Sequence, residues 1–254
     1  MLKFSVCVEM IFREEGVEYE ERIAKAAVAG ADAVEFWGTQ NKDIDALAAA
    51  ARTNGVAIAT CGSTGHPIVD ASVKDAFAAE LRDTAIPIAR KLGVPGVLKT
   101  VGQEMEGVDR RVQHNAIVDA LKAAAPVLEE AGMKMYVEPL NVAVNHKGYY
   151  LYSSEQAFEI LREVGSPNVL LLYDIYHQQI TEGNIIQTIE ENIDLIGHFH
   201  LADVPGRNEP GTGELNYANI FRRIDALNYD GYVGMEFKPT IDHSDAVKRT
   251  IALA

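Results

Sequence analysis

Residues 169–201 read VLLLYDIYHQQITEGNIIQTIEENIDLIGHFHL and contain a strand-like run, a helical segment and a second strand-like run. The runs Val169–Asp174 and Ile196–Leu201 are short and largely apolar, which predicts buried strands. Between them, Ile185–Ile193 carries isoleucine at helical spacing. Buried strands joined through a helix are typical of a parallel βαβ unit. This stretch therefore predicts a parallel sheet.

The same alternation extends along the whole chain. Strands are predicted at Phe4–Val8, Ala33–Trp37, Val56–Cys61, Val97–Val101, Lys134–Glu138, Val169–Asp174, Ile196–Leu201 and Tyr232–Phe237. Helices are predicted at Glu20–Ala29, Asp43–Asn54, Val73–Leu92, Arg110–Ala131, Ser154–Val164, Ile185–Ile193, Tyr217–Leu227 and Ser244–Leu253. Eight units in 254 residues average about 32 residues each, which is the size of a βαβ repeat.

This repeat favours an α/β fold in which one (β/α)₈ TIM barrel occupies residues 1–254 as a single domain. The main alternative is a doubly wound open sheet, which usually carries a glycine-rich turn after its first strand. Here residues 9–15 read EMIFREE and contain no glycine. No linker or shift in composition divides the chain, so we expect one barrel.

Composition and charge exclude several classes of protein. Lys and Arg total 23 against 37 Asp and Glu, a net charge of −14 that disfavours nucleic acid and anionic membranes as partners. Cys7 and Cys61 lie in apolar stretches and are expected to be buried free thiols, as in a reducing compartment. No apolar run approaches the ~20 residues that span a bilayer. With no recognisable targeting segment at the start of the sequence, a cytoplasmic location is expected.

Four predicted strands end on a side chain that can bind a metal, namely Glu138, Asp174, His200 and Glu236. The C-terminal ends of parallel barrel strands meet at one mouth, so these side chains are expected to converge. Three carboxylates and one imidazole suit one divalent ion, Mn²⁺, Mg²⁺ or Co²⁺, rather than a structural zinc. The alternative is a salt-bridge network with the nearby cations Lys99, Lys238 and Arg207.

Other polar residues lie near these strand ends. His177 is one turn beyond Asp174, where it can touch a substrate oxygen or cap a helix. His198 points the same way as His200 but deeper in the barrel, which predicts a supporting role. Trp37 ends the second strand, where it can stack on a sugar or pack in the core. Lys99 is a candidate for binding a substrate carboxylate. Because no basic cluster is present, an unphosphorylated small substrate is favoured.

These segments resemble the hydroxypyruvate isomerase family of the xylose isomerase-like TIM barrels, a group that also holds ketose 3-epimerases, inosose-processing enzymes and apurinic endonucleases. The resemblance is carried by residues 137–141 (VEPLN), 173–177 (YDIYH), 197–207 (GHFHLADVPGR), 209–217 (EPGTGELNY) and 236–239 (EFKP). It implies that Glu138, Asp174, His200 and Glu236 bind a divalent metal and that Glu138 and Glu236 transfer protons. It also implies that His177 and Arg207 touch substrate and that no organic cofactor is needed. Related families often form dimers or tetramers, so a homo-oligomer is possible here, although the sequence does not reveal the oligomeric state.

The leading hypothesis is a metal-dependent isomerase acting through an enediolate, such as one converting hydroxypyruvate to tartronate semialdehyde. A ketose 3-epimerase is the alternative, because some hydroxypyruvate isomerases have Gln where His200 stands and the epimerases have His. Phosphodiester cleavage is disfavoured by the charge, and because only Glu9, Glu35 and His66 are available as further ligands. A sugar-binding barrel with a structural ion is the non-enzymatic alternative.

Overall fold

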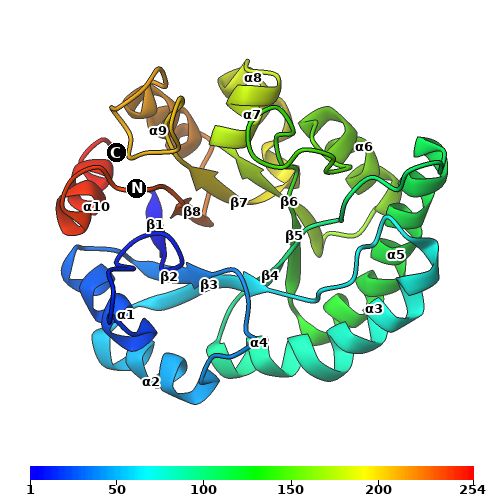
Figure 1. Ribbon diagram of the computed structural model, residues 1–254, viewed down its shortest axis with the longest axis horizontal. Coiled ribbons are helices and arrows are strands. Elements are labelled where there is room, and N and C mark those ends of the chain that lie inside the picture. The colour runs from blue at the N-terminus through cyan, green and yellow to red at the C-terminus, as the bar shows by residue number, and fades with distance from the viewer.

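The computed structural model describes residues 1–254 and shows a closed barrel of parallel strands in the order β1 to β8 (Figure 1). The strands are β1 Lys3–Cys7, β2 Ala33–Phe36, β3 Ala57–Gly62, β4 Gly96–Lys99, β5 Lys134–Val137, β6 Val169–Asp174, β7 Ile196–Leu201 and β8 Tyr232–Met235. Strand β8 pairs with β1 and closes the ring. The prediction of a (β/α)₈ barrel is confirmed, with strand ends within two residues of those expected.

Helices form an outer ring around the strands (Figure 1). They are α1 Tyr19–Val28, α2 Ile44–Asn54, α3 Lys74–Glu80, α4 Ile86–Leu92, α5 Arg110–Ala131, α6 Ser154–Val164, α7 Ile175–Thr181, α8 Ile185–Asn192, α9 Tyr217–Ala226 and α10 His243–Ile251. Short 3₁₀ turns cover Ala71–Val73 and Ile193–Leu195. Among all these helices, not one combines the length and the apolar character that a membrane crossing requires.

The predicted helix Val73–Leu92 is interrupted in the structure. A π turn at Leu81–Ala85 separates α3 from α4, and Pro87 lies in the first turn of α4. Proline has no amide hydrogen to complete the α-helical bond to the carbonyl four residues before it. The wider turn directly ahead of Pro87 accommodates that missing donor, and a π turn of this kind inside a helix is a recognised local adjustment.

Helix α7 follows β6 directly and is not predicted by the periodicity. The Asp174 carboxylate accepts hydrogen bonds from the backbone N–H groups of Tyr176 at 2.8 Å and His177 at 3.2 Å. An aspartate at this N-cap position satisfies amides that have no partner within the helix. The cap thus begins a seven-residue helix at the barrel mouth and brings His177 back towards Asp174.

The strand register determines which side chains share a level in the barrel. Asp174 on β6 lies opposite His200 on β7, and His200 lies opposite Gly234 on β8. A core cluster of 69 buried residues packs the barrel and its helices together. This packing supports the strand ends at the mouth, where function is placed in barrels of this type.

Candidate metal centre and active site

The four predicted ligands meet at the mouth of the barrel. Each of Glu138, Asp174, His200 and Glu236 offers one ligand atom, and these atoms lie within 4.8 Å of one another. All four residues are buried, with at most 5% of their surface exposed. The backbone N–H of Glu138 donates to the backbone carbonyl of Lys99, and that of Glu236 donates to the backbone carbonyl of Leu201. The sheet pairing therefore continues up to both glutamates.

The donor atoms of this cluster fit a divalent cation. Nδ1 of His200 is buried without a hydrogen-bond partner, 3.5 Å from Oε1 of Glu138 and 3.3 Å from Oε2 of Glu236. Three carboxylates buried together repel one another and lose their hydration unless a positive charge lies among them. Carboxylate oxygens with one imidazole nitrogen suit Mn²⁺, Mg²⁺ or Co²⁺.

The electrostatics of the cluster are uneven. Burial raises the pKa of Glu138, and it raises the pKa of Asp174 to about 6. Burial also opposes ionisation of Glu236, but the charges of His200 and Arg207 outweigh it and lower the pKa of Glu236. For His200, burial disfavours the charged ring, whereas Glu236 and Glu35 raise its pKa. Glu236 is therefore firmly ionised, while Glu138 lacks a comparable counter-charge.

Arg207 is the basic side chain that reaches the carboxylates. Its Nη2 donates to Oε2 of Glu236 at 2.5 Å and lies 3.8 Å from Oδ2 of Asp174. The guanidinium also lies over the ring of Tyr176, 5.1 Å from the centroid. Arg207 has φ +59, a left-handed conformation that is uncommon for a residue with a side chain. Such strain persists where the surrounding structure enforces it, which here directs the guanidinium at Glu236.

Asp203 holds the loop that carries Arg207. Its carboxylate is fully buried and accepts four backbone hydrogen bonds, with donors Val204, Gly211, Gly213 and Leu215 at 2.8 to 3.1 Å. The backbone carbonyl of Asp203 also accepts from the N–H of Arg207. Sequence reasoning missed this anchor, although an acidic residue that begins a loop with several glycines is a signal for such a role.

The other two candidate cations lie away from the carboxylates. Lys238 is exposed, and only its backbone N–H contributes, by donating to the carbonyl of Arg207 at 2.8 Å. Nζ of the buried Lys99 donates to the carbonyls of Thr64 and His66, at 3.2 and 2.5 Å. Burial lowers the pKa of Lys99 to about 8. The structure thus places Lys99 under the loop after β3. Lys99 does not line the cavity that opens beside the cluster.

A cavity of about 410 Å³ opens beside the cluster. Trp37 lines it, is 47% exposed, and donates from Nε1 to Oε1 of Glu236 at 2.6 Å. The opposite wall comes from loops after β3, β4 and β5 and includes Ser63, Thr100 and His146. Sequence reasoning did not single out these three residues. Both glutamates of the cluster face this same space.

His177 also lines the cavity and is locked in place by Asn141. Its Nδ1 accepts from the backbone N–H of Asn141 at 3.1 Å and lies 2.6 Å from Nδ2 of the same residue. Burial lowers the pKa of His177 to about 3, so the ring is neutral. With Nδ1 accepting, Nε2 carries the hydrogen. That atom is buried without a partner, 3.5 Å from Oδ2 of Asp174.

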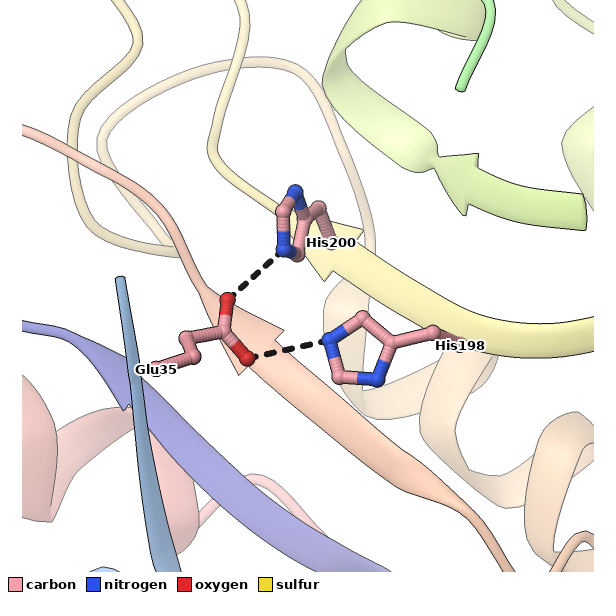
Figure 2. Close-up of side chains that lie close together, drawn as sticks. All are labelled: Glu35, His198 and His200. Carbon is pink, nitrogen blue, oxygen red and sulfur yellow. Dashed lines mark hydrogen bonds and ion pairs between the residues drawn. The ribbon is translucent and has the colours of Figure 1, made fainter. Parts of the chain in front are cut away.

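His198 lies one layer below the cluster, where its ring packs edge to face against that of His200, with centroids 5.2 Å apart, and its only polar contact is with Glu35. Its Nε2 is 3.0 Å from Oε2 of Glu35, and Nε2 of His200 is 2.7 Å from Oε1 of the same carboxylate (Figure 2). Sequence reasoning treated Glu35 only as a possible extra ligand for a nuclease site. The signal that it has another role is a charged residue within the apolar run Ala33–Phe36.

The remaining candidate ligands for a multi-metal site are engaged elsewhere. Glu9 pairs with Lys42 at 2.8 Å and accepts from the hydroxyl of Tyr19. His66 pairs with Glu80 at 2.9 Å. Neither residue belongs to a group that could hold a metal. Glu9 and His66 therefore add nothing to the four-residue cluster, and the one other group of possible ligands, Glu35, His198 and His200, shares His200 with it.

With this geometry in view, sequence comparison places the chain among known proteins. Residues 23–253 match the sequence model of the family described as "Xylose isomerase-like TIM barrel". The chain belongs to the xylose isomerase-like TIM barrel family. It is 33% identical to hydroxypyruvate isomerase of Escherichia coli over 251 residues, covering 94% of each chain. It is 32% identical to 2-oxo-tetronate isomerase of Pectobacterium atrosepticum, covering 94% of this chain and 93% of that one.

Solved structures of other proteins share the same barrel fold. A Brucella melitensis protein described as a family 2 AP endonuclease superposes with a TM-score of 0.91 at 27% identity, covering 99% of both chains. An L-ribulose 3-epimerase superposes with a TM-score of 0.80 at 23% identity, covering 99% of this chain and 93% of that one. The second likeness shows the fold alone. Together with the isomerase relatives, the family places this chain among isomerase enzymes.

Proposed function

We propose that this enzyme is a divalent-metal-dependent isomerase of a short hydroxy-carbonyl acid, interconverting hydroxypyruvate and tartronate semialdehyde or a four-carbon homologue. The observation that carries the proposal is the buried cluster Glu138, Asp174, His200 and Glu236, which opens onto the cavity through its two glutamates. The names of the relatives from E. coli and P. atrosepticum support the substrate class. The two buried free cysteines are compatible with the reducing cytoplasm that we propose as its location.

The reaction moves a carbonyl between adjacent carbons, which requires removing a weakly acidic C–H proton to give an enediolate. A divalent cation held by the four residues would stabilise negative charge that develops on the substrate oxygens. The side chains must then carry out the proton transfer. One carboxylate must take the proton from one carbon and return it to the neighbouring carbon, and the hydroxyl proton must pass to the oxygen that was the carbonyl.

Glu138 is the better placed of the two glutamates for this proton transfer. Both oxygens of Glu236 are held by donors, Oε1 by Trp37 and Oε2 by Arg207. The carboxylate of Glu138 has two other carboxylates near it, and its only cationic or ring-nitrogen contact is the ring of His200, at 3.5 Å. A carboxylate without fixed donors can rotate towards substrate and accept a proton without losing hydrogen bonds. We therefore assign proton transfer to Glu138, with Glu236 as the fixed anion on the other side.

His177 and Arg207 are suited to orient the substrate. Nε2 of His177 and Nε of Arg207 are both buried without hydrogen-bond partners, and both residues line the cavity. Each is a donor, so each can hold a carbonyl, carboxylate or hydroxyl oxygen of the substrate. Fixing these oxygens would align the two reacting carbons with Glu138, which is how positioning lowers a barrier.

A ketose 3-epimerase is the second candidate. It is favoured by one observation, that Glu138 and Glu236 border the same cavity. Two carboxylates on opposite sides of one carbon could remove its proton from one face and return another to the other face. The donors on Glu236 argue against this, because a proton acceptor held by Trp37 and Arg207 is less basic.

The test uses the purified enzyme, stripped with EDTA and reloaded with Mn²⁺, Mg²⁺ or Co²⁺. Hydroxypyruvate, 2-oxo-tetronate and a series of ketoses are supplied in D₂O, and products are identified by NMR. The proposal expects metal-dependent conversion of a keto-acid to an aldehyde, lost in Glu138→Gln and retained in the exposed control Glu130→Gln. A C3 epimer from a ketose would establish the second candidate instead. Turnover that survives complete metal removal would contradict both.

A further inference from the structure

The side chains of Glu35 on β2 and of His198 and His200 on β7 meet in the barrel interior, beneath the proposed metal centre. Glu35 lies between the rings of His198 and His200, with one carboxylate oxygen directed at each ring (Figure 2). The distances are 3.0 Å to Nε2 of His198 and 2.7 Å to Nε2 of His200. Ser5 donates its hydroxyl to Oε2 of Glu35 at 2.5 Å. All these residues are at least 98% buried, so water does not compete for the carboxylate.

Local backbone features bring Glu35 to this position. The pairing of β2 with β3 shifts register between Val34 and Glu35, and such irregularities redirect a side chain. On β8, Gly234 leaves the space that the carboxylate and the ring of His200 occupy. A Cβ on Gly234 would lie 2.5 Å from Oε1 of Glu35 and 2.7 Å from Cδ2 of His200. The glycine thus permits a contact between side chains from β2 and β7.

This contact determines which nitrogen of His200 faces the metal centre. Nε2 faces Glu35, whereas Nδ1 faces Glu138 and Glu236. A carboxylate accepts hydrogen bonds and cannot donate when ionised, so Nε2 must carry the hydrogen. The neutral ring then has its lone pair on Nδ1. A metal-binding histidine commonly donates its other N–H to a carboxylate in this way, which fixes both tautomer and orientation.

We propose that Glu35 is a positioning residue of the metal centre, holding His200 as the Nε2–H tautomer so that Nδ1 binds the cation. This proposal rests on the proposed metal-dependent function. His198 and Ser5 hold Glu35 in turn, because each occupies Oε2 and leaves Oε1 for His200. His198 therefore supports the centre through its hydrogen bond with Glu35, and its ring also packs edge to face against His200.

The same three residues also satisfy the distance requirement for a second metal site. Two features argue against it. Oε2 of Glu35 already accepts from Ser5 and contacts His198, and His200 would have to bind one metal through each nitrogen. A second divalent cation there would have to displace the hydrogen bond from Ser5 and the contacts of both imidazole rings with Glu35. A stoichiometry of two metals per chain would therefore overturn the proposal.

The first experiment measures metal affinity by calorimetric titration of the EDTA-stripped full-length protein with Mn²⁺. Glu35→Gln keeps the shape of the side chain but removes its charge, and we expect the Kd to rise about 10–100-fold. The exposed Glu130→Gln is the matched control and leaves the Kd within twofold. Gly234→Ala, which displaces Glu35 and His200 together, is expected to weaken binding as Glu35→Gln does. A Kd within twofold of the parent in Glu35→Gln would overturn the proposal.

The second experiment reads the hydrogen position directly in the unmodified protein, so it remains informative even if a variant fails to fold. In ¹⁵N-histidine-labelled, Mg²⁺-saturated protein, the ring of His200 should carry its proton on Nε2, as a downfield, slowly exchanging resonance. Glu35→Gln should lose that resonance. A proton on Nδ1 in the parent would overturn the proposal. If the parent binds no metal, the proposed function fails, whereas the role of Glu35 is still tested on the metal-free protein, where the slowly exchanging Nε2 resonance should be present in the parent and lost in Glu35→Gln.

Discussion

Replacing Asp203 with Asn tests whether one buried carboxylate organises the loop that places Arg207. Oδ1 of Asp203 accepts from the N–H groups of Val204 and Leu215, and Oδ2 accepts from those of Gly211 and Gly213. Asparagine has nearly the same shape but only one acceptor oxygen. Its amide nitrogen is a donor and must face two backbone donors, so two of the four bonds are lost.

The expected loss of folding stability follows from those two unpaired donors. Leaving a buried donor unsatisfied costs about 1–3 kcal/mol, which gives about 2–6 kcal/mol for two. Because the four bonds lie in a partly buried loop, the lower half of that range, about 2–4 kcal/mol, is expected. This loss is a large share of the free energy of unfolding of a typical protein, which is about 5–15 kcal/mol. The carbonyl of residue 203 also accepts from Arg207, so the guanidinium is expected to move away from Glu236.

Urea unfolding followed by circular dichroism measures the loss of stability, and steady-state kinetics measures the loss of function. We expect a lower midpoint with an unchanged m-value, and a decrease of at least about tenfold in kcat/KM. Asp43→Asn is the matched control, because Asp43 is an exposed N-cap and Asn caps helices equally well. If Asp203→Asn unfolds within about 0.5 kcal/mol of the parent, the loop is not held by this carboxylate.

Three further perturbations probe the site and buried groups elsewhere in the barrel. Trp37→Phe removes the donor 2.6 Å from Oε1 of Glu236 but keeps an aromatic wall, so steady-state kinetics should show kcat/KM lower by about tenfold or more, with Mn²⁺ affinity unchanged. The pKa of buried Lys99 is about 8 against 10.5 when unfolded, so the unfolded chain binds more protons between these values and stability rises with pH there. Urea titrations at pH 7.5 and 10 should thus show the parent gaining up to about 3 kcal/mol relative to Lys99→Met, and an equal pH response in the two proteins would contradict a buried ammonium. Burial raises the pKa of the Cys61 thiol to about 12 and that of Cys7 well above its usual range, so a thiol reagent should label both only after unfolding, and rapid labelling of the native protein would contradict their burial.

The clustering of the four candidate ligands could be predicted from sequence because parallel topology brings strand ends together. Glu138, Asp174, His200 and Glu236 follow apolar runs whose lengths determine where each strand stops. Once the barrel closes, these four positions share one mouth regardless of their separation along the chain. The strand and helix ranges were predictable for the same reason, since hydrophobic periodicity reports burial that the closed barrel imposes.

Contacts that depend on side-chain direction could not be predicted in the same way. Lys99 is the last residue of β4, so the sequence places it at the same end of the barrel as the four candidate ligands. Its ammonium is nevertheless directed to the carbonyls of Thr64 and His66. Glu35 reaches His200 because of an irregularity in β2 and a missing side chain at Gly234. Each outcome depends on the shape of a neighbouring strand or loop, and hydrophobic pattern carries no information about that shape.

The two glutamates show how neighbours divide roles between residues that look equivalent in sequence. Glu138 and Glu236 each come directly after a strand, and each lies in the same cluster. Glu236 receives donors from Trp37 after β2 and Arg207 after β7, whereas Glu138 receives none of comparable strength. Because hydrogen bonds to a carboxylate stabilise its charged form, Glu236 is held as an anion and Glu138 is left able to gain and lose a proton. One mobile base serves a transfer between adjacent carbons, and inversion at one carbon needs two. The arrangement of donors, more than the identity of the ligands, therefore favours isomerisation over epimerisation.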